Sequence, residues 1–184
     1  MTELLTDQIE SPVGTLFLIV AGASLCALDF AGYAARMHKL LHAHYGAVTL
    51  KQVDDPHGFS SRIRAYLGGE LQSLAAIPVS AAGTPFQQQV WAALRTIPPG
   101  SVTTYGTLAA QIGRPTASRA VGMTNSLNPI AIVVPCHRVV GANATLTGYA
   151  GGLERKQWLL QHEGVDLAAW GRGRTHPQQI SLLE

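Results

Sequence analysis

The chain has 184 residues, which is enough for one large domain or two small ones. Hydrophobic residues make up 47% and charged residues 13%, which is typical of a well-buried globular protein and excludes a disordered tail or a fibre. Apolar runs are short, and the N-terminus lacks a basic segment followed by an apolar core. We therefore expect no transmembrane helix, no secretory signal and no membrane association. Two cysteines without an export signal predict a cytoplasmic protein.

Charge is distributed unevenly along the chain. Residues 1–83 carry five Lys/Arg and seven Asp/Glu, a net charge of −2, whereas residues 84–184 carry eight and four, a net charge of +4. A basic C-terminal half favours an anionic partner, with nucleic acid as the leading candidate. A charge of this size is also typical of an ordinary solvated surface, so both interpretations stay open.

Local patterns in the first half predict a small domain that mixes helices and strands. Two strand-like runs flank residues 21–24 and indicate a β-hairpin. The expected elements are strands at 15–20 and 25–30, a helix at 33–45, a strand at 47–53, a helix at 59–68 and an edge strand at 77–79. A boundary falls at 80–83, so the first domain is predicted to span residues 1–80.

The second half predicts a helix-turn-helix. Helices are expected at residues 85–97, 105–112 and 116–127. Thr84 and Thr104 suit N-cap positions, Pro85 suits a first turn, and Thr116 offers a hydroxyl cap to the third helix. The second and third helices are short and are separated by Gly113, as in a helix-turn-helix.

The end of the chain completes this second domain. Residues 148–152 predict a flexible loop or wing, and residues 153–162 predict an amphipathic helix. The domain is therefore expected to span 84–167. Residues 168–184 are rich in Gly, Arg, Pro and Gln and predict a flexible tail.

The helix expected at 116–127 has an unusually small surface. Ala117, Ser118, Ala120 and Gly122 are small, and Arg119 is the only charged residue of the helix. Small residues allow close approach to another surface, from which one arginine would project. They also allow helices to pack together, so the composition alone leaves both interpretations open.

A single thiol beside an imidazole, Cys136-His137, lies between two β-forming runs within residues 132–140. A reactive cysteine needs a base and a residue that orients the base, whereas most buried cysteines are inert. On a continuous strand the two side chains would face opposite ways, so we expect Pro135 to bend the chain and a water to join them. Glu163 or Glu154 could orient the imidazole.

Five segments carry a resemblance to a known family. They are Ser118-Arg119-Ala120-Val121-Gly122, Asn128-Pro129, Pro135-Cys136-His137-Arg138-Val139-Val140, Thr147-Gly148-Tyr149-Ala150-Gly151-Gly152 and His162-Glu163-Gly164. Together they resemble the O6-alkylguanine-DNA alkyltransferases (methylated-DNA–protein-cysteine methyltransferases), most closely the bacterial constitutive branch. The motifs cover about residues 84–165, and the first half resembles the family more weakly.

This resemblance implies an α+β fold, with a small N-terminal α/β domain of ribonuclease H-like type followed by a winged helix-turn-helix domain. It implies a DNA repair protein that flips O6-alkylguanine, and also O4-alkylthymine, out of duplex DNA and transfers the alkyl group irreversibly to Cys136. The thioether product is stable, so each molecule reacts once and needs no cofactor. The implied partner is the minor groove of double-stranded DNA, bound by a monomer.

The resemblance also implies catalytic roles. Cys136 is the acceptor, His137 acts as a base through a water, and Glu163 orients His137. Tyr105 rotates the phosphate and donates a hydrogen bond to the flipped base. Asn128 braces the turn between the recognition helix and the cysteine segment.

Binding roles follow in the same way, with Arg119 as the finger that enters the base stack. The implied DNA-binding residues are Thr104, Tyr105, Ser118, Arg119, Ala120, Gly122 and Arg138. The implied pocket residues are Pro135, Val139, Tyr149, Ala150, Gly151 and Lys156, the last of these near the rim of the active site.

Several positions depart from the family pattern. Ser118, Met123 and Thr124 are bulkier than the Ala or Gly usual in relatives, and Asn143-Ala144 stands where Asn-Gly is commoner.

Metal binding is not expected. Some relatives hold zinc through N-terminal cysteines, but this half contains only Cys26. His38, His42 and His44 have near-ligand spacing, which is also the ordinary pattern of histidines on a solvated helix face.

Two other functions compete with alkyl transfer. A non-catalytic module that flags lesions or regulates transcription would bind DNA alike, but flagging relatives replace the cysteine and such regulators carry a further metal-binding domain. A cysteine hydrolase would need an oxyanion hole and an acyl pocket, for which the sequence shows no signature.

Overall fold

The structure, a computed structural model, describes residues 2–171, with side chains up to residue 169. It divides into two compact units. One comprises the residues up to Gly83 together with Pro129–Val133, and the other comprises Thr84–Asn128 together with the residues from Val134 onward. Both units mix helices and strands, which confirms the predicted α+β class. None of the described helices is long and apolar enough to cross a membrane.

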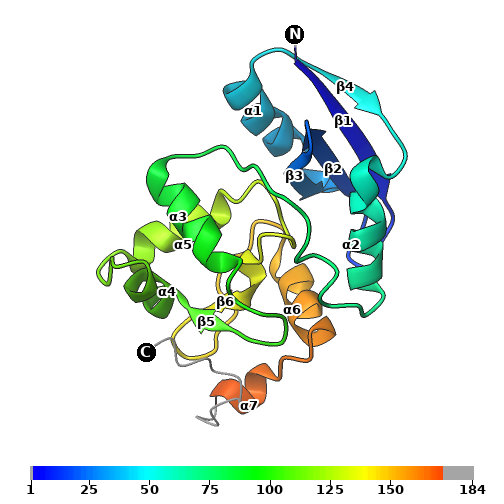
Figure 1. Ribbon diagram of the computed structural model, residues 1–184. Coiled ribbons are helices and arrows are strands. Elements are labelled where there is room, and N and C mark those ends of the chain that lie inside the picture. The colour runs from blue at the N-terminus through cyan, green and yellow to red at the C-terminus, as the bar shows by residue number, and fades with distance from the viewer. Residues whose placement is uncertain (1, 172–184) are drawn as a thin grey trace. The chain divides into compact units, whose positions relative to one another are not determined.

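A four-stranded sheet forms the centre of the first unit (Figure 1). Its strands are β1 (Thr2–Ile9), β2 (Leu16–Ala21), β3 (Ser24–Phe30) and β4 (Val48–Gln52). Their order is β3-β2-β1-β4, with β1 and β4 parallel and the other pairs antiparallel. The predicted hairpin and the strand at 47–53 are confirmed, whereas β1 was not predicted.

Strand β1 escaped prediction because a buried polar residue interrupts its apolar pattern. Asp7 is only 5% exposed, and its carboxylate accepts hydrogen bonds from the Ser60 hydroxyl, the Gln52 amide and the Asp55 backbone N–H. These donors hold the pKa of Asp7 below its ordinary value although burial opposes them. A carboxylate thus joins β1 to β4 and the helix that follows it, where the sequence showed only a charged residue.

Helices flank this sheet (Figure 1). They are η1 (Ala31–Tyr33), α1 (Ala34–Tyr45), η2 (Pro56–Gly58) and α2 (Phe59–Leu67). Helix α1 packs Met37 and Leu41 against Leu4 of β1 and Ile19 of β2. The predicted helices at 33–45 and 59–68 are therefore confirmed. The predicted edge strand at 77–79 is reduced to one bridge, between Val79 and Leu25.

A short return of the chain completes the first unit. Leu28 of β3 donates its N–H to the carbonyl of Pro129 and accepts from the N–H of Ala131. The strand-like run before the cysteine is thereby attached to the sheet over Pro129–Val133 only. The chain joins the second unit again at Val134, two residues before Cys136.

The second unit surrounds a two-stranded parallel pair with helices (Figure 1). Its elements are α3 (Pro85–Leu94), β5 (Thr103–Thr104), α4 (Tyr105–Gln111), α5 (Ser118–Ser126), η3 (Cys136–Arg138), β6 (Val139–Val140), α6 (Leu153–His162) and α7 (Leu167–Gly171). Helices α4 and α5 form the predicted helix-turn-helix.

Two of the three N-caps predicted for this unit are confirmed. Thr84 and Gln87 form a reciprocal capping box at α3, and the Thr104 hydroxyl accepts the N–H of Thr107 at α4. The hydroxyl cap predicted for α5 is wrong. That helix begins at Ser118, two residues later than expected, its N-cap is Ala117, and no side chain caps it.

The loop after β6 contains a tight turn. A Cβ on Gly141 would overlap the Thr145 hydroxyl and crowd the Thr145 carbonyl, so glycine allows the close approach of the two residues. Ala144 adopts a φ of +58°, a left-handed conformation that glycine would take with less strain. The turn therefore forms with Asn143-Ala144 despite the departure from Asn-Gly.

The predicted tail at 168–184 begins inside α7. The Asp166 carboxylate accepts the N–H of Ala169 and so caps this short helix, which a composition argument could not detect. Residues 172–184 lie outside the described residues.

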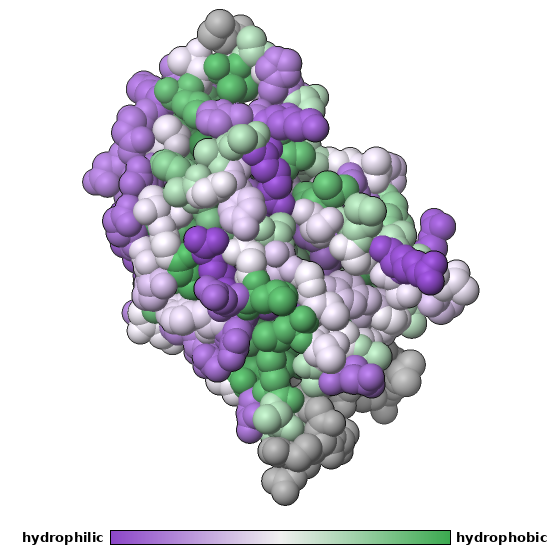
Figure 2. Space-filling model, turned by 180° about the vertical axis from the view of Figure 1, so that it is seen from behind, coloured by the Kyte–Doolittle hydropathy of each residue, from purple (hydrophilic) through white to green (hydrophobic). Residues whose placement is uncertain are grey.

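Few large apolar side chains are left at the surface. Among the described side chains, those that are exposed are Met123, Leu127 and Leu153. On the face shown in Figure 2, hydrophobic residues form patches with hydrophilic residues around them.

Candidate active site around Cys136

Cys136 lies in a tight turn and not on a continuous strand. Its N–H donates to the carbonyl two residues back at 2.8 Å, and the N–H of Arg138 donates to the carbonyl of Pro135 at 3.0 Å. Ile132 has a φ of +70° and Pro135 a ψ of 63°, so the chain bends twice before the cysteine. The expected bend is present, but alternation along a strand does not set the directions of Cys136 and His137.

Next to the cysteine, three charged or titratable side chains form a buried cluster. Nε2 of His137 lies 3.0 Å from Oε1 of Glu163. Arg138 donates to both oxygens of Glu163, at 2.7 Å from Nη2 and 2.9 Å from Nε, and also to the carbonyl of Ile97. Burial alone would raise the pKa of Glu163, but its hydrogen bonds and charge interactions with His137 and Arg138 hold the pKa well below its ordinary value. Glu163 is therefore ionised.

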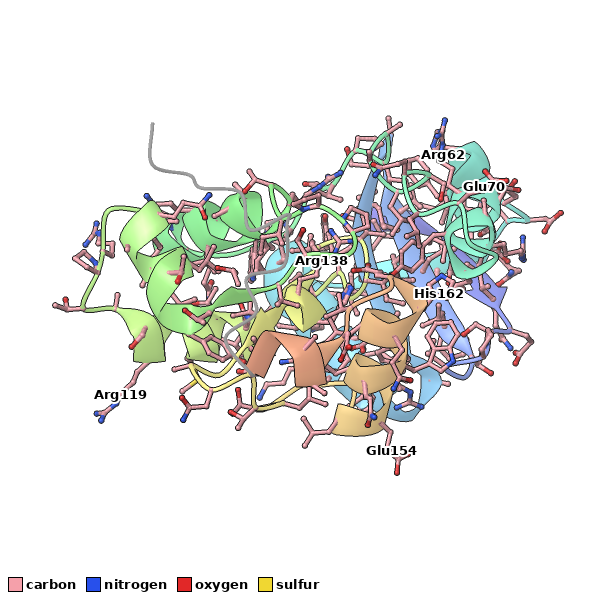
Figure 3. The ribbon with its side chains drawn as sticks, turned by 90° about the horizontal axis from the view of Figure 1, so that it is seen from below. Arg62, Glu70, Arg119, Arg138, Glu154 and His162 are labelled. Carbon is pink, nitrogen blue, oxygen red and sulfur yellow. The ribbon has the colours of Figure 1, made fainter. Side chains whose placement is uncertain are left out.

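The prediction that Arg138 binds DNA is wrong for this structure. Its side chain is only 7% exposed and is occupied by Glu163. Figure 3 shows Arg138 among the ribbons of the domain, whereas Arg119 projects outward. A sequence signal existed: Glu163 ends a helix, where the helix dipole disfavours a carboxylate, so a nearby cation was needed.

His137 is a neutral base in this setting. The side chain is completely buried, and desolvation lowers its pKa although the Glu163 carboxylate favours the charged form. Since Glu163 is an acceptor, the hydrogen-bond network assigns the proton to Nε2. Nδ1 then carries a lone pair and makes no hydrogen bond within the described residues. His137 can accept a proton there.

Asn128 contacts the nucleophile directly. Its side-chain amide donates to Sγ of Cys136 at 3.1 Å and to the carbonyl of Val134 at 2.8 Å. The residue follows α5 and is 2% exposed. The structure thus agrees with the bracing position implied for Asn128 and adds a hydrogen-bond donor to the sulfur, which favours the thiolate.

Lys156 is a buried amine and does not lie at the rim where it was expected. It is fully buried, and Nζ donates to the carbonyls of Val139 at 2.6 Å and Thr147 at 2.9 Å. Desolvation lowers the pKa of Lys156 to about 8, while the charge of Cys136 acts in the opposite direction. The amine therefore interacts electrostatically with the nucleophile and fixes the loop before α6.

Tyr105 lies near the cysteine because β5 and β6 are paired. Strand β5 ends at Thr104, directly before Tyr105, and β6 begins directly after η3. The Tyr105 hydroxyl donates to the carbonyl of Thr147 at 3.4 Å. Burial raises the pKa of Tyr105, so the phenol stays protonated and can act as a donor at neutral pH.

The remaining pocket candidates lie before and after Cys136 in the sequence, and their side chains differ in exposure. Pro135, Val139 and Gly151 are buried, whereas Tyr149 and Ala150 are partly exposed. Gly151 uses its carbonyl to accept a hydrogen bond from Arg155 on α6.

The outer side of α5 is largely open. Arg119 and Ala120 are exposed and Ser118 is half-buried. Gly122 lies beside the ring of Tyr105, since a Cβ there would be 3.7 Å from the ring. Thr104 is used as the cap of α4.

Thr124, one of the bulky departures, is 3% exposed and does not reach the open face of α5. Its carbonyl accepts the indole N–H of Trp91. The departure at this position therefore affects packing inside the domain.

Metal ligands are not assembled in the described part of the chain. No group of three or more His, Cys, Asp or Glu side chains there is arranged to hold a metal ion, and this applies to His38, His42 and His44 of α1.

Comparison with known proteins decides the family. Residues 4–81 match the family described as 6-O-methylguanine DNA methyltransferase, ribonuclease-like domain, and residues 85–165 match its DNA binding domain. A methylated-DNA–protein-cysteine methyltransferase of Shigella flexneri is 48% identical over 167 residues, which cover 89% of this chain and 98% of the relative. The chain belongs to the O6-methylguanine-DNA methyltransferase family.

Solved structures of O6-methylguanine-DNA methyltransferases have the same fold. A Mycobacterium tuberculosis OGT in complex with DNA has a TM-score of 0.73 and 41% identity, covering 88% of this chain and 92% of its own. The enzyme of Pyrococcus kodakaraensis has a TM-score of 0.70 and 29% identity, covering 88% and 99%. The implied family and its two-part fold are therefore confirmed.

Proposed function

We propose that this chain repairs DNA by accepting an alkyl group from O6-alkylguanine on Cys136. The observation that carries the proposal is the buried centre itself. It joins Cys136 to a hydrogen-bond donor, Asn128, and places beside it a neutral imidazole oriented by an ionised carboxylate. The relatives named methylated-DNA–protein-cysteine methyltransferase support the same chemistry.

The reaction is a displacement at the carbon of the alkyl group. The Cys136 thiol loses its proton, through a water, to Nδ1 of His137, and Glu163 stabilises the resulting imidazolium. The thiolate forms a carbon–sulfur bond while the carbon–oxygen bond breaks. The electron pair of that bond stays on the base, where the Tyr105 phenol donates a hydrogen bond as negative charge develops.

The products are an unmodified base, once it has taken up a proton, and a thioether on Cys136. A thioether is a poor alkyl donor, because the Cys136 thiolate would have to leave, and the other cysteine lies in the core of the first unit. Each molecule of protein is therefore consumed by one reaction.

Access to the lesion requires that the base leave the duplex, because the alkyl group is otherwise stacked inside it. Helix α5 is the element that enters the minor groove, since its outer side is open and small at Ala120. Arg119 projects outward from the helix (Figure 3). In the proposed complex its side chain takes the place of the flipped base.

The test compares two substrates for the same thiol. Arg119→Ala should slow reaction with alkylated duplex DNA by about 10- to 100-fold, as expected when unstacking loses a support worth a few kcal/mol. Reaction with free O6-benzylguanine should be unchanged, because no base needs to be flipped.

The matched control is Arg62→Ala, an exposed arginine of α2 in the first unit. It should change neither rate. Equal losses on both substrates for Arg119→Ala would contradict the finger role, and failure of the unmodified protein to alkylate Cys136 with either substrate would contradict the function.

A further inference from the structure

The open side of α5 carries large apolar side chains that remain exposed among the residues that the structure describes. Arg119, Met123 and Leu127 follow each other at intervals of four residues, so they form one stripe along the helix and its C-cap. Met123 is 65% exposed and Leu127 is 39% exposed. Outside this stripe, only Leu153 is a comparably exposed large hydrophobic residue among the described side chains.

Charge around the stripe points to a polyanion as the partner. The sequence contains no Asp or Glu between Glu70 and Glu154, a stretch that includes the whole helix-turn-helix. Within this stretch, Arg138 is paired with Glu163 inside the domain, whereas Arg119 is exposed. An apolar face without carboxylates fits a surface that is negative and also presents hydrocarbon edges, as the deoxyribose walls of the minor groove do.

We infer that Met123 and Leu127 pack against the deoxyribose walls of the minor groove beside the step that Arg119 enters. This inference rests on the proposed function and deepens it. It assigns part of the affinity for duplex DNA to apolar contact, in addition to phosphate contacts. Methionine suits such a place because its unbranched chain adapts to an irregular surface, and apolar wedges at unstacked steps are a known means of minor-groove binding.

The alternative is that these side chains hold the helix away from the groove floor. The two cases predict opposite changes in the affinity for duplex DNA when Met123 is shortened. If Met123 makes contact, shortening it weakens binding. If it obstructs, shortening it tightens binding.

Binding is measured by fluorescence anisotropy with an unmodified DNA duplex, so that it is separated from alkyl transfer. Met123→Ala should weaken binding by about 5-fold, the loss expected from uncovering half of a methionine side chain. The slope of log K against log salt should stay unchanged, because no phosphate contact is lost, whereas Arg119→Ala should reduce it. Leu153→Ala, the matched control on α6, should bind as the unmodified protein does.

A charge-matched pair makes the test sharper. Met123→Glu places a carboxylate in the groove and should weaken binding by more than about 20-fold, while Leu153→Glu adds the same charge elsewhere and should have a much smaller effect. Reaction of each variant with free O6-benzylguanine reports that its domain is folded.

Equal or tighter binding by Met123→Ala, or equal losses for the two Glu variants, would overturn the inference. Failure of the unmodified protein to alkylate Cys136 would instead overturn the proposed function, and the anisotropy result would stand independently of it.

Discussion

The two cysteines of this chain are almost equally buried, yet they lie in opposite chemical surroundings. Cys26 is 4% exposed and Cys136 is 6% exposed. Cys26 lies in β3 within an apolar cluster, and its thiol donates to the carbonyl of Ile19 at 3.3 Å. Burial raises the pKa of Cys26 to about 11, so this thiol stays protonated.

Cys136 has partners that favour the thiolate. Asn128 donates to its sulfur and Lys156 interacts with its charge. We propose that the imidazole of His137 accepts its proton. The comparison teaches that burial alone does not make a cysteine inert. Hydrogen-bond donors and nearby charges decide the protonation of a buried thiol.

The largest expected effect comes from removing the carboxylate of the buried cluster. Glu163→Gln should slow alkylation of Cys136 by free O6-benzylguanine about 100-fold, since His137 loses the group that stabilises its charged form. It should also cost about 3–5 kcal/mol of unfolding free energy, because Arg138 is left buried without its carboxylate. Rates and urea unfolding curves measure both effects. Glu154→Gln, an exposed acid on the same helix, should change neither, and a full rate in Glu163→Gln would contradict the role of the cluster.

A second prediction concerns the amine that interacts with Cys136. The pKa of Lys156 is about 8, below its ordinary 10.5, so the folded protein releases this proton before the unfolded chain does. Between these two pH values the unfolded state binds more protons, and stability should rise with pH by about 3 kcal/mol.

Lys156→Met removes this titration, so its unfolding free energy should not share the rise. Urea unfolding at a series of pH values tests the difference between the two proteins. If the difference in unfolding free energy between the two proteins stays constant between the two pKa values, the pKa of Lys156 is not lowered by folding.

The smallest expected effect is a difference in stability between variants of Asn128 and Asn125, two buried amides near the end of α5. Asn128→Leu removes the donor to Cys136 and leaves the Val134 carbonyl without that partner, which should cost about 1–3 kcal/mol and slow alkylation. The Asn125 side chain is buried but makes no hydrogen bond within the described residues. Asn125→Leu should therefore be neutral or stabilising. Thermal unfolding measures the stability of both variants. Similar losses of stability in the two would show that the hydrogen bonds of Asn128 do not stabilise the fold.

Much of the fold followed from local patterns. The hairpin, α1, α4 and the N-caps at Thr84 and Thr104 depend on neighbours in the sequence, and each was predicted. Strand β1 depends on Asp7, whose partners lie more than 40 residues away, and no local pattern could reveal them. The bend at Pro135 was expected, but the β-forming residues that flank Cys136 gave no sign of the left-handed conformation at Ile132.

The site was predicted by motif more than by geometry. The adjacency of His137 and Glu163 was expected from the family pattern, and the two side chains do meet. Arg138 and Lys156 were misplaced because the family resemblance supplied their positions but not the partners of their side chains. Arg138 donates to Glu163, and Lys156 donates to two backbone carbonyls, so both side chains point into the domain.

The most direct test of the contrast between the two cysteines is mass spectrometry of the protein after incubation with an excess of duplex DNA containing O6-methylguanine. One methyl group per chain is predicted, on the peptide that contains Cys136, with Cys26 unmodified and no further reaction with added substrate. Methylation of Cys26, or loss of the lesion with Cys136 unmodified, would contradict the assignment of Cys136 as the single acceptor.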